Sequence, residues 1–158
     1  MEESRSRGIP DLTVADVMSF PLVTIEAEVS LSHARDLLEQ YHCHHLVVTN
    51  GGSPVAVVSD RDIIRALSPF LGTIVEQARD QHTLLRPVLH VATFHPVTVH
   101  RSASIYEAAA TLLERGISCL PVVDDMGRIV GIVTSSDLMR GMLSCRLPAT
   151  GPTLADVA

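Results

Sequence analysis

The chain has 158 residues, a length that favours one compact domain, and its apolar content of 46% excludes an intrinsically disordered protein. No apolar stretch reaches the roughly 18 residues that a membrane-spanning helix needs. The charged N-terminus contains no signal peptide, so we expect a cytoplasmic protein. The net charge of −6 argues against binding to nucleic acid or to a membrane surface, and three cysteines without CxxC spacing do not form a disulfide framework.

An internal repeat divides the chain in two. Three pairs of segments match at a nearly constant offset: Ser30–Ala34 with Ser104–Ala108, His45–Asn50 with Cys119–Asp124, and Ala56–Ile64 with Gly131–Met139. Because repeated segments indicate repeated structure, each half is interpreted as the same unit. We divide the chain into a flexible N-terminus (1–11), a first repeat (12–68), a partly helical linker (69–87), a second repeat (88–143) and a flexible tail (144–158).

The first repeat shows the pattern β-α-β-β-α. In chain order we expect a strand at Leu22–Ile25, a helix capped by Ser30, a hairpin of Leu46–Thr49 and Val55–Ser59, and a helix that ends near Leu67. Asn50–Gly52 supplies turn residues that tolerate positive φ. The linker that follows is predicted to be helical at Ile74–Arg79.

The second repeat shows the same pattern. We expect a strand at Val97–Val99, a helix capped by Ser104, a hairpin of Leu120–Val123 and Ile129–Thr134, and a helix that ends near Met142. A half of this size is marginally stable alone, so the two should share a core. The predicted fold is α/β (α+β), with two β-α-β-β-α repeats packed with pseudo-twofold symmetry.

The second repeat closely resembles a known domain. Leu120–Asp124, Gly127 and Gly131–Asp137 are similar to the motif of the cystathionine β-synthase (CBS) domain, and two repeats in tandem resemble the CBS pair, or Bateman module. The resemblance extends from about Leu12 to Leu143. It implies a regulatory module rather than an enzyme, with no required cofactor, which binds AMP, ADP or ATP, or less often S-adenosylmethionine, in clefts between the repeats.

The resemblance also implies the binding residues. In family sites the motif Asp bonds the ribose hydroxyls and the motif Ser or Thr meets the phosphates, which points to Ser59 and Asp62 in the first site, and to Thr134 and Asp137 in the second. The strands that would line the adenine contribute Thr24, Ile25, Leu46, Val47, Thr98, Val99, Leu120 and Pro121. Gly131 would allow a close approach of the backbone, and Arg61 would meet a phosphate in the first site.

These polar residues also have a purely structural interpretation. Ser59 and Thr134 are equally suitable as helix caps, and a carboxylate in the first helical turn, as at Asp62 and Asp137, is stabilising without a ligand. The two roles are compatible. An ionised Asp accepts charge-assisted hydrogen bonds from hydroxyls, and a helix N-terminus favours anions.

A metal site and an enzyme are the alternatives that the sequence supports least. Residues His42–His45 offer four potential ligands, but no matching Cys/His constellation accompanies them, and we expect exposed histidines and no metal. Cys119 is expected to act as a small apolar side chain. The sequence contains no GxSxG, P-loop or GxGxxG motif, so no catalytic residue is assigned.

We expect the output of such a module to pass through another protein, because residues 1–11 and 144–158 are too few to form a further domain. The resemblance implies a homodimer formed through the terminal helices, Arg61–Leu67 and Asp137–Leu143. A different hypothesis remains open, in which the chain is a constitutive dimerisation scaffold that binds no nucleotide.

Overall fold

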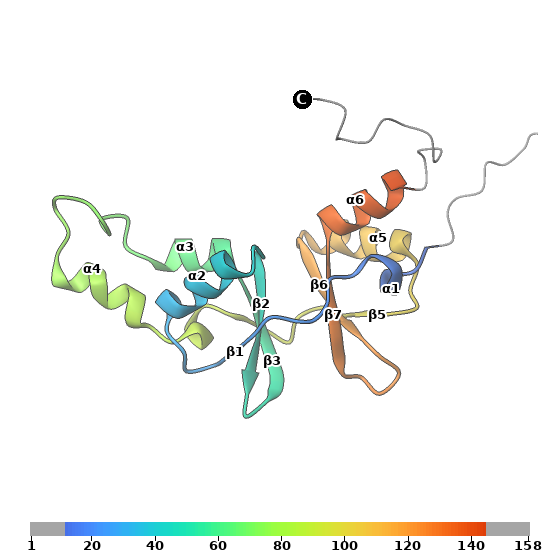
Figure 1. Cartoon of the computed structure of the whole chain (residues 1–158), viewed down its shortest axis with the longest axis horizontal. Helices are drawn as coiled ribbons and strands as arrows, with labels where there is room; N and C mark the ends of the chain where they lie inside the picture. The colour runs from blue at the N-terminus through green and yellow to red at the C-terminus, as the bar shows by residue number, and fades with distance from the viewer. Residues whose placement is uncertain (1–11, 145–158) are drawn as a thin grey trace, which may run out of the picture. The chain divides into compact units, whose positions relative to one another are not determined.

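The structure, a computed structural model, describes residues 12–144 (Figure 1). These residues form two compact units. The Ser59 unit comprises Pro21–Val97, and the Thr134 unit comprises residues 12–20 together with residues 98–144. The mixed α/β class predicted from the sequence is confirmed. The expected flexible ends lie outside the described residues, apart from Ser144.

The Ser59 unit is built on a four-stranded sheet of order β1-β2-β3-β4, in which β1 runs parallel to β2 and the other neighbours are antiparallel. Its strands are β1 (Thr24–Glu26), β2 (His45–Asn50), β3 (Ser53–Ser59) and β4 (Thr93–Phe94). Its helices are α2 (Leu31–Gln40), α3 (Asp60–Ala66), α4 (Ala78–His82), η1 (Thr83–Leu85) and η2 (Val88–His90). Helices α2 and α3 lie on the same side of this sheet (Figure 1).

The helical spacing of the apolar residues in α2 explains how this unit buries its core. Leu31, Ala34 and Leu38 repeat at intervals of three and four, and all three are buried. They pack in one cluster with residues from the strands and α3, namely Ile25, Leu46, Val48, Ala56, Val58 and Ile63. The Ser30 hydroxyl accepts a hydrogen bond from the His33 N–H at 3.3 Å and caps the helix, as predicted.

The Thr134 unit repeats this plan with a three-stranded sheet of order β5-β6-β7. Its elements are α1 (Val14–Val17), β5 (Val99–His100), α5 (Ile105–Arg115), β6 (Cys119–Val123), β7 (Ile129–Thr134) and α6 (Ser135–Ser144). Ser104 caps α5, and Gly116, with φ of 63°, ends it in the left-handed conformation. Ile105, Ala108 and Leu112 are buried at the positions that correspond to Leu31, Ala34 and Leu38 in the other unit.

Each unit is completed by the first residues of the other repeat. Helix α1, at the start of the first repeat, joins the Thr134 unit, where the Val14 N–H donates to the Ala103 carbonyl at 2.8 Å. In the same way, the start of the second repeat joins the Ser59 unit, where the Val88 N–H donates to the Val29 carbonyl at 2.8 Å and β4 pairs with β3. The boundaries of the two compact units therefore do not coincide with the boundaries of the two sequence repeats.

Both leading strands start later than predicted, and Pro121 explains the late start of β5. The strand expected at Val97–Val99 is observed at Val99–His100, and the one expected at Leu22–Ile25 is observed at Thr24–Glu26. In the Ser59 unit the Val47 N–H donates to the Val23 carbonyl at 3.1 Å. Pro121, in the place of Val47, has no N–H to donate, so β5 pairs with β6 only from Val99 onward.

The linker helix predicted at Ile74–Arg79 is wrong in its position. Helix α4 begins at Ala78, because the Gln77 N–H donates to the Asp80 carboxylate at 2.8 Å and marks the helix start there. The residues before it form turns, in which the Gly72 N–H donates to the Glu76 carboxylate at 2.8 Å. Within residues 12–144, none of the helices is both long and apolar enough to cross a membrane.

Gly131 lies where the chain leaves no room for a side chain. An ideal Cβ at this position would lie 2.5 Å from the Met18 sulfur and 3.3 Å from the Ser19 carbonyl oxygen. Ser19 exchanges backbone hydrogen bonds with Ile132, at 2.9 and 3.2 Å, which draws the α1 segment against β7. The absence of a side chain at Gly131 therefore makes room for the Met18–Ser19 segment of the same protein.

We predict that Gly131→Ala destabilises the protein by about 1–3 kcal/mol, because the added methyl group overpacks the contact with Met18. Urea unfolding followed by circular dichroism measures this change. The double variant Gly131→Ala/Met18→Ala removes the sulfur, so its loss should be smaller than the sum of the two single losses. Additive losses would contradict the proposed contact.

Candidate functional site

The first repeat places its two motif residues at the start of α3. Ser59 has extended backbone angles, and its N–H and its hydroxyl both donate to Oδ2 of Asp62, at 3.0 and 2.6 Å. In return, the Asp62 N–H donates to the Ser59 hydroxyl oxygen at 3.3 Å. This reciprocal arrangement is a capping box, which satisfies N–H groups that the first helical turn leaves without partners.

The second repeat builds the same arrangement at the start of α6. The N–H and the hydroxyl of Thr134 donate to Oδ2 of Asp137 at 2.9 and 2.7 Å, and the Asp137 N–H donates to the Thr134 hydroxyl oxygen at 3.3 Å. The structural interpretation of these residues as helix caps is therefore confirmed in both repeats.

The capping box leaves part of the hydrogen-bonding capacity of each motif carboxylate free. In both motifs it engages only Oδ2, while an ionised carboxylate offers two oxygens and about four lone pairs. Both Asp side chains are partly buried, and the box fixes the direction in which Oδ1 points. Such an oxygen is a preorganised acceptor for a hydroxyl group, which makes the ligand-binding role compatible with the cap.

The charges beside the two motifs differ. Next to Asp62, the His44 Nδ1 lies 2.8 Å from Oδ2 of Asp60, and the Arg61 N–H donates to Oδ1 of Asp60 at 2.7 Å. Burial alone would raise the pKa of Asp60, but these hydrogen bonds outweigh it and leave the pKa below its usual value. The Arg61 residue itself is exposed at the start of the helix.

The Thr134 motif has serines where the first motif has Asp60 and Arg61, and both of these serines are exposed. Its nearby cation lies one turn later. The Nη1 atom of Arg140 is 3.4 Å from Oδ1 of Asp137. The sequence analysis did not identify Arg140; its position three residues after the motif Asp in a predicted helix was the available indication.

The residues expected to line an adenine lie on both faces of the sheets. Ile25 and Leu46 belong to the core cluster of the Ser59 unit, so their side chains are buried in the core and cannot line a ligand. Thr24 and Val47 alternate with them and point to the opposite face. In the Thr134 unit, Leu120 and Pro121 are buried, Val99 is half-buried, and Thr98 is exposed just before β5.

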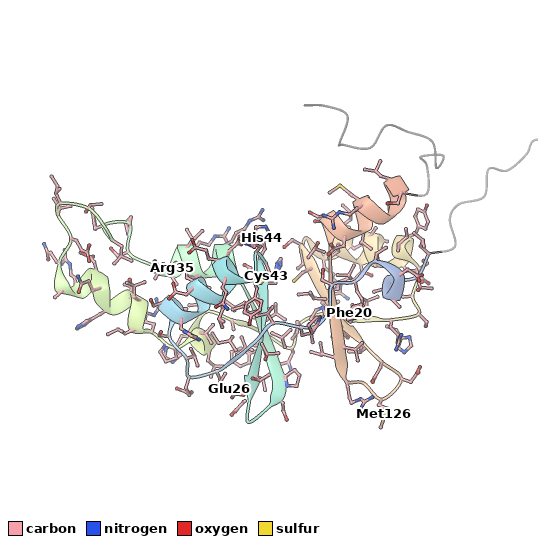
Figure 2. The ribbon with its side chains drawn as sticks, viewed as in Figure 1. Phe20, Glu26, Arg35, Cys43, His44 and Met126 are labelled. Atoms are coloured by element: carbon pink, nitrogen blue, oxygen red, sulfur yellow. The ribbon has the colours of Figure 1, made fainter. Side chains whose placement is uncertain are left out.

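A groove between α2 and α3 was not predicted from the sequence. Its volume is about 480 Å³, its lining includes the apolar residues Leu38, Ile63 and Leu67, and Arg35, Cys43 and His44 lie around it (Figure 2). Burial raises the pKa of the Cys43 thiol, which disfavours the reactive thiolate. Within residues 12–144, no group of three or more His, Cys, Asp or Glu side chains is arranged to hold a metal ion.

Two solved structures resemble this chain closely. The complex of CBSX2, a CBS-pair protein from Arabidopsis thaliana, with AMP has 30% sequence identity and a TM-score of 0.68, over 85% of this chain and 98% of that one. The CBS domain pair of protein MJ0100, in complex with 5-methylthioadenosine and S-adenosyl-L-methionine, has 26% identity and a TM-score of 0.70, with the same coverage.

The L-aspartate semialdehyde sulfurtransferase of Methanocaldococcus jannaschii is 30% identical over 139 residues, which make up 87% of this chain. The chain spans only 25% of the length of that protein. The family model of the CBS domain matches residues 14–69 and again residues 88–144, which together include both capping boxes described above. The chain therefore belongs to the CBS domain family and carries two CBS domains in tandem.

Proposed function

We propose that this chain is a regulatory module that binds an adenine nucleotide at its motif helices and passes the state of occupancy to another protein. The observation that carries the proposal is the pair of capping boxes, each of which holds a carboxylate with Oδ1 outside the box. The relatives support the ligand class, because CBSX2 is described in complex with AMP and MJ0100 with two other adenosine compounds.

The chemistry of adenosine suits this carboxylate. The two ribose hydroxyls donate hydrogen bonds, and a carboxylate oxygen accepts them with charge assistance. The box holds Asp62 and Asp137 in position before the ligand arrives, so little side-chain freedom is lost on binding. AMP, ADP, ATP, 5-methylthioadenosine and S-adenosylmethionine all share this ribose, and AMP is the form we propose.

The phosphate is expected to distinguish the two motifs. Arg61 is exposed at the start of α3, where a phosphate would gain a cation. The Thr134 motif has Ser136 in the place of Arg61. There a phosphate would be held by the Thr134 hydroxyl and by the N–H groups at the start of the ten-residue helix α6. The pseudo-twofold packing and the binding clefts between the repeats stay predictions.

We propose a homodimer formed through the terminal helices of the two repeats. Apolar side chains are exposed on α3 and α6: Ile64 is 69% exposed, Met139 56% and Leu143 61%. Exposed apolar side chains grouped on helices favour association. The exposed apolar side chains also favour the second candidate function, a constitutive scaffold. In such a scaffold the motif residues would serve only to cap helices α3 and α6. No catalytic role is proposed for either helix.

We predict that AMP binds to the wild-type protein, and that Asp62→Ala and Asp137→Ala each weaken their own site. Loss of charge-assisted hydrogen bonds to ribose costs about 1.5–3 kcal/mol, or roughly 10- to 150-fold in affinity. Isothermal titration calorimetry measures the affinity of each site. A scaffold without a nucleotide ligand predicts no heat of binding and no AMP-dependent rise in melting temperature.

Helix α1 provides a matched control for the loss of a cap. The N–H and hydroxyl of Thr13 both donate to Oδ2 of Asp16 at 2.8 Å, so this box has the geometry of the motif boxes without the CBS motif. Asp16→Ala should lower the melting temperature and leave AMP affinity unchanged. An equal loss of affinity in Asp16→Ala would show that capping, and not ribose contact, explains the effect of the motif variants.

We predict that Ile64→Asp combined with Met139→Asp weakens self-association, because charges would have to be buried in the dimer interface. Sedimentation equilibrium measures the dissociation constant. Met126 is 77% exposed on the turn between β6 and β7 (Figure 2), so Met126→Asp is the matched control and should change nothing. An unchanged dimer in the double variant would place the interface elsewhere.

A further inference from the structure

The two CBS repeats place an arginine at the same helical position, but only one of these arginines touches the motif carboxylate. Arg65 follows Asp62 by three residues in α3, and Arg140 follows Asp137 by three residues in α6. The Nη1 atom of Arg140 lies 3.4 Å from Oδ1 of Asp137. Within residues 12–144, no ion pair joins Arg65 to Asp62. The two motifs therefore carry the same pair of residues, but only Arg140 contacts its carboxylate.

The atom that Arg140 touches is the one that the capping box leaves outside. Thr134 occupies Oδ2 of Asp137 through two hydrogen bonds, and Arg140 lies against Oδ1. A guanidinium at Oδ1 offers its own N–H groups to the lone pairs that a ribose hydroxyl would use, and it partly neutralises the carboxylate. The ligand must therefore share this oxygen with Arg140 or displace the guanidinium.

We propose that Arg140 competes with the ribose at Asp137 and so makes the Thr134 site the weaker of two unequal nucleotide sites. This inference rests on the proposed function, since it concerns the same carboxylate. In the Ser59 motif the corresponding cation, Arg65, makes no ion pair with Asp62 in the described part of the chain, while Arg61 is exposed at the helix start. A basic residue thus assists the phosphate in one repeat and masks the ribose acceptor in the other.

The exposure of the Arg140 side chain limits how much its removal can change the affinity for AMP. The Arg140 side chain is 76% exposed, and ion pairs of such residues contribute about 0.2–1 kcal/mol. Removal of the guanidinium should therefore strengthen binding at the Thr134 site by about 1.4- to 5-fold. The direction is diagnostic: loss of a cation near an anionic nucleotide weakens binding by simple electrostatics, so a gain in affinity requires competition at the carboxylate.

Calorimetric titration with AMP tests the proposal in a background that keeps one site at a time. In Asp62→Ala, which leaves the Thr134 site, Arg140→Ala and Arg140→Gln should each raise the affinity for AMP by about 1.4- to 5-fold. In Asp137→Ala, which leaves the Ser59 site, the matched variant Arg65→Ala should change nothing. Circular dichroism confirms that each variant is folded.

The outcomes separate this inference from the proposed function. Unchanged or lower AMP affinity in both Arg140 variants would overturn the competition, even if the wild type binds AMP at two sites. An equal gain in Arg65→Ala would also overturn it, because Arg65 does not touch a motif carboxylate. Absence of AMP binding to the wild type would contradict the proposed function itself, and this inference with it.

Discussion

One carboxylate oxygen at the start of each motif helix determines how the rest of the site is arranged. Oδ2 of Asp62 and of Asp137 accepts both the N–H and the hydroxyl of the residue three positions earlier. This bond starts the helix directly at the end of a hairpin strand and fixes the orientation of the carboxylate. The second oxygen then becomes the point where the two repeats differ, since Arg140 touches it in one unit and Arg65 does not in the other.

The two repeats also exchange segments, and each unit depends on residues from both repeats. A single CBS repeat leaves one edge of its hairpin unpaired, and the first residues of the other repeat pair with that edge. Gly131 allows this in the Thr134 unit, because Met18 and Ser19 occupy the space of a side chain. In the Ser59 unit Ala56 stands at the position of Gly131, and its partner on the neighbouring strand is Phe94 of β4.

Local signals predicted most of the fold and the identity of the motif residues. Ser30 and Ser104 cap the expected helices, and the buried positions of α2 and α5 follow the apolar period. The exchange of α1 was not predictable, because four residues carry no measurable period and their place depends on contacts distant in sequence. For the same reason, the contact of Arg140 with Oδ1 required side-chain geometry, and the start of α4 depended on which Asp formed a capping box.

The most direct test of this account is a crystal structure of the complex with AMP. We predict that Oδ1 of Asp62 or Asp137 lies within hydrogen-bonding distance of a ribose hydroxyl, roughly 2.5–3.0 Å, while Oδ2 keeps its bonds to Ser59 or Thr134. A structure in which the ribose meets neither carboxylate would contradict it. So would one in which binding opens the capping box, because the cap and the ligand would then be alternatives rather than simultaneous uses of one side chain.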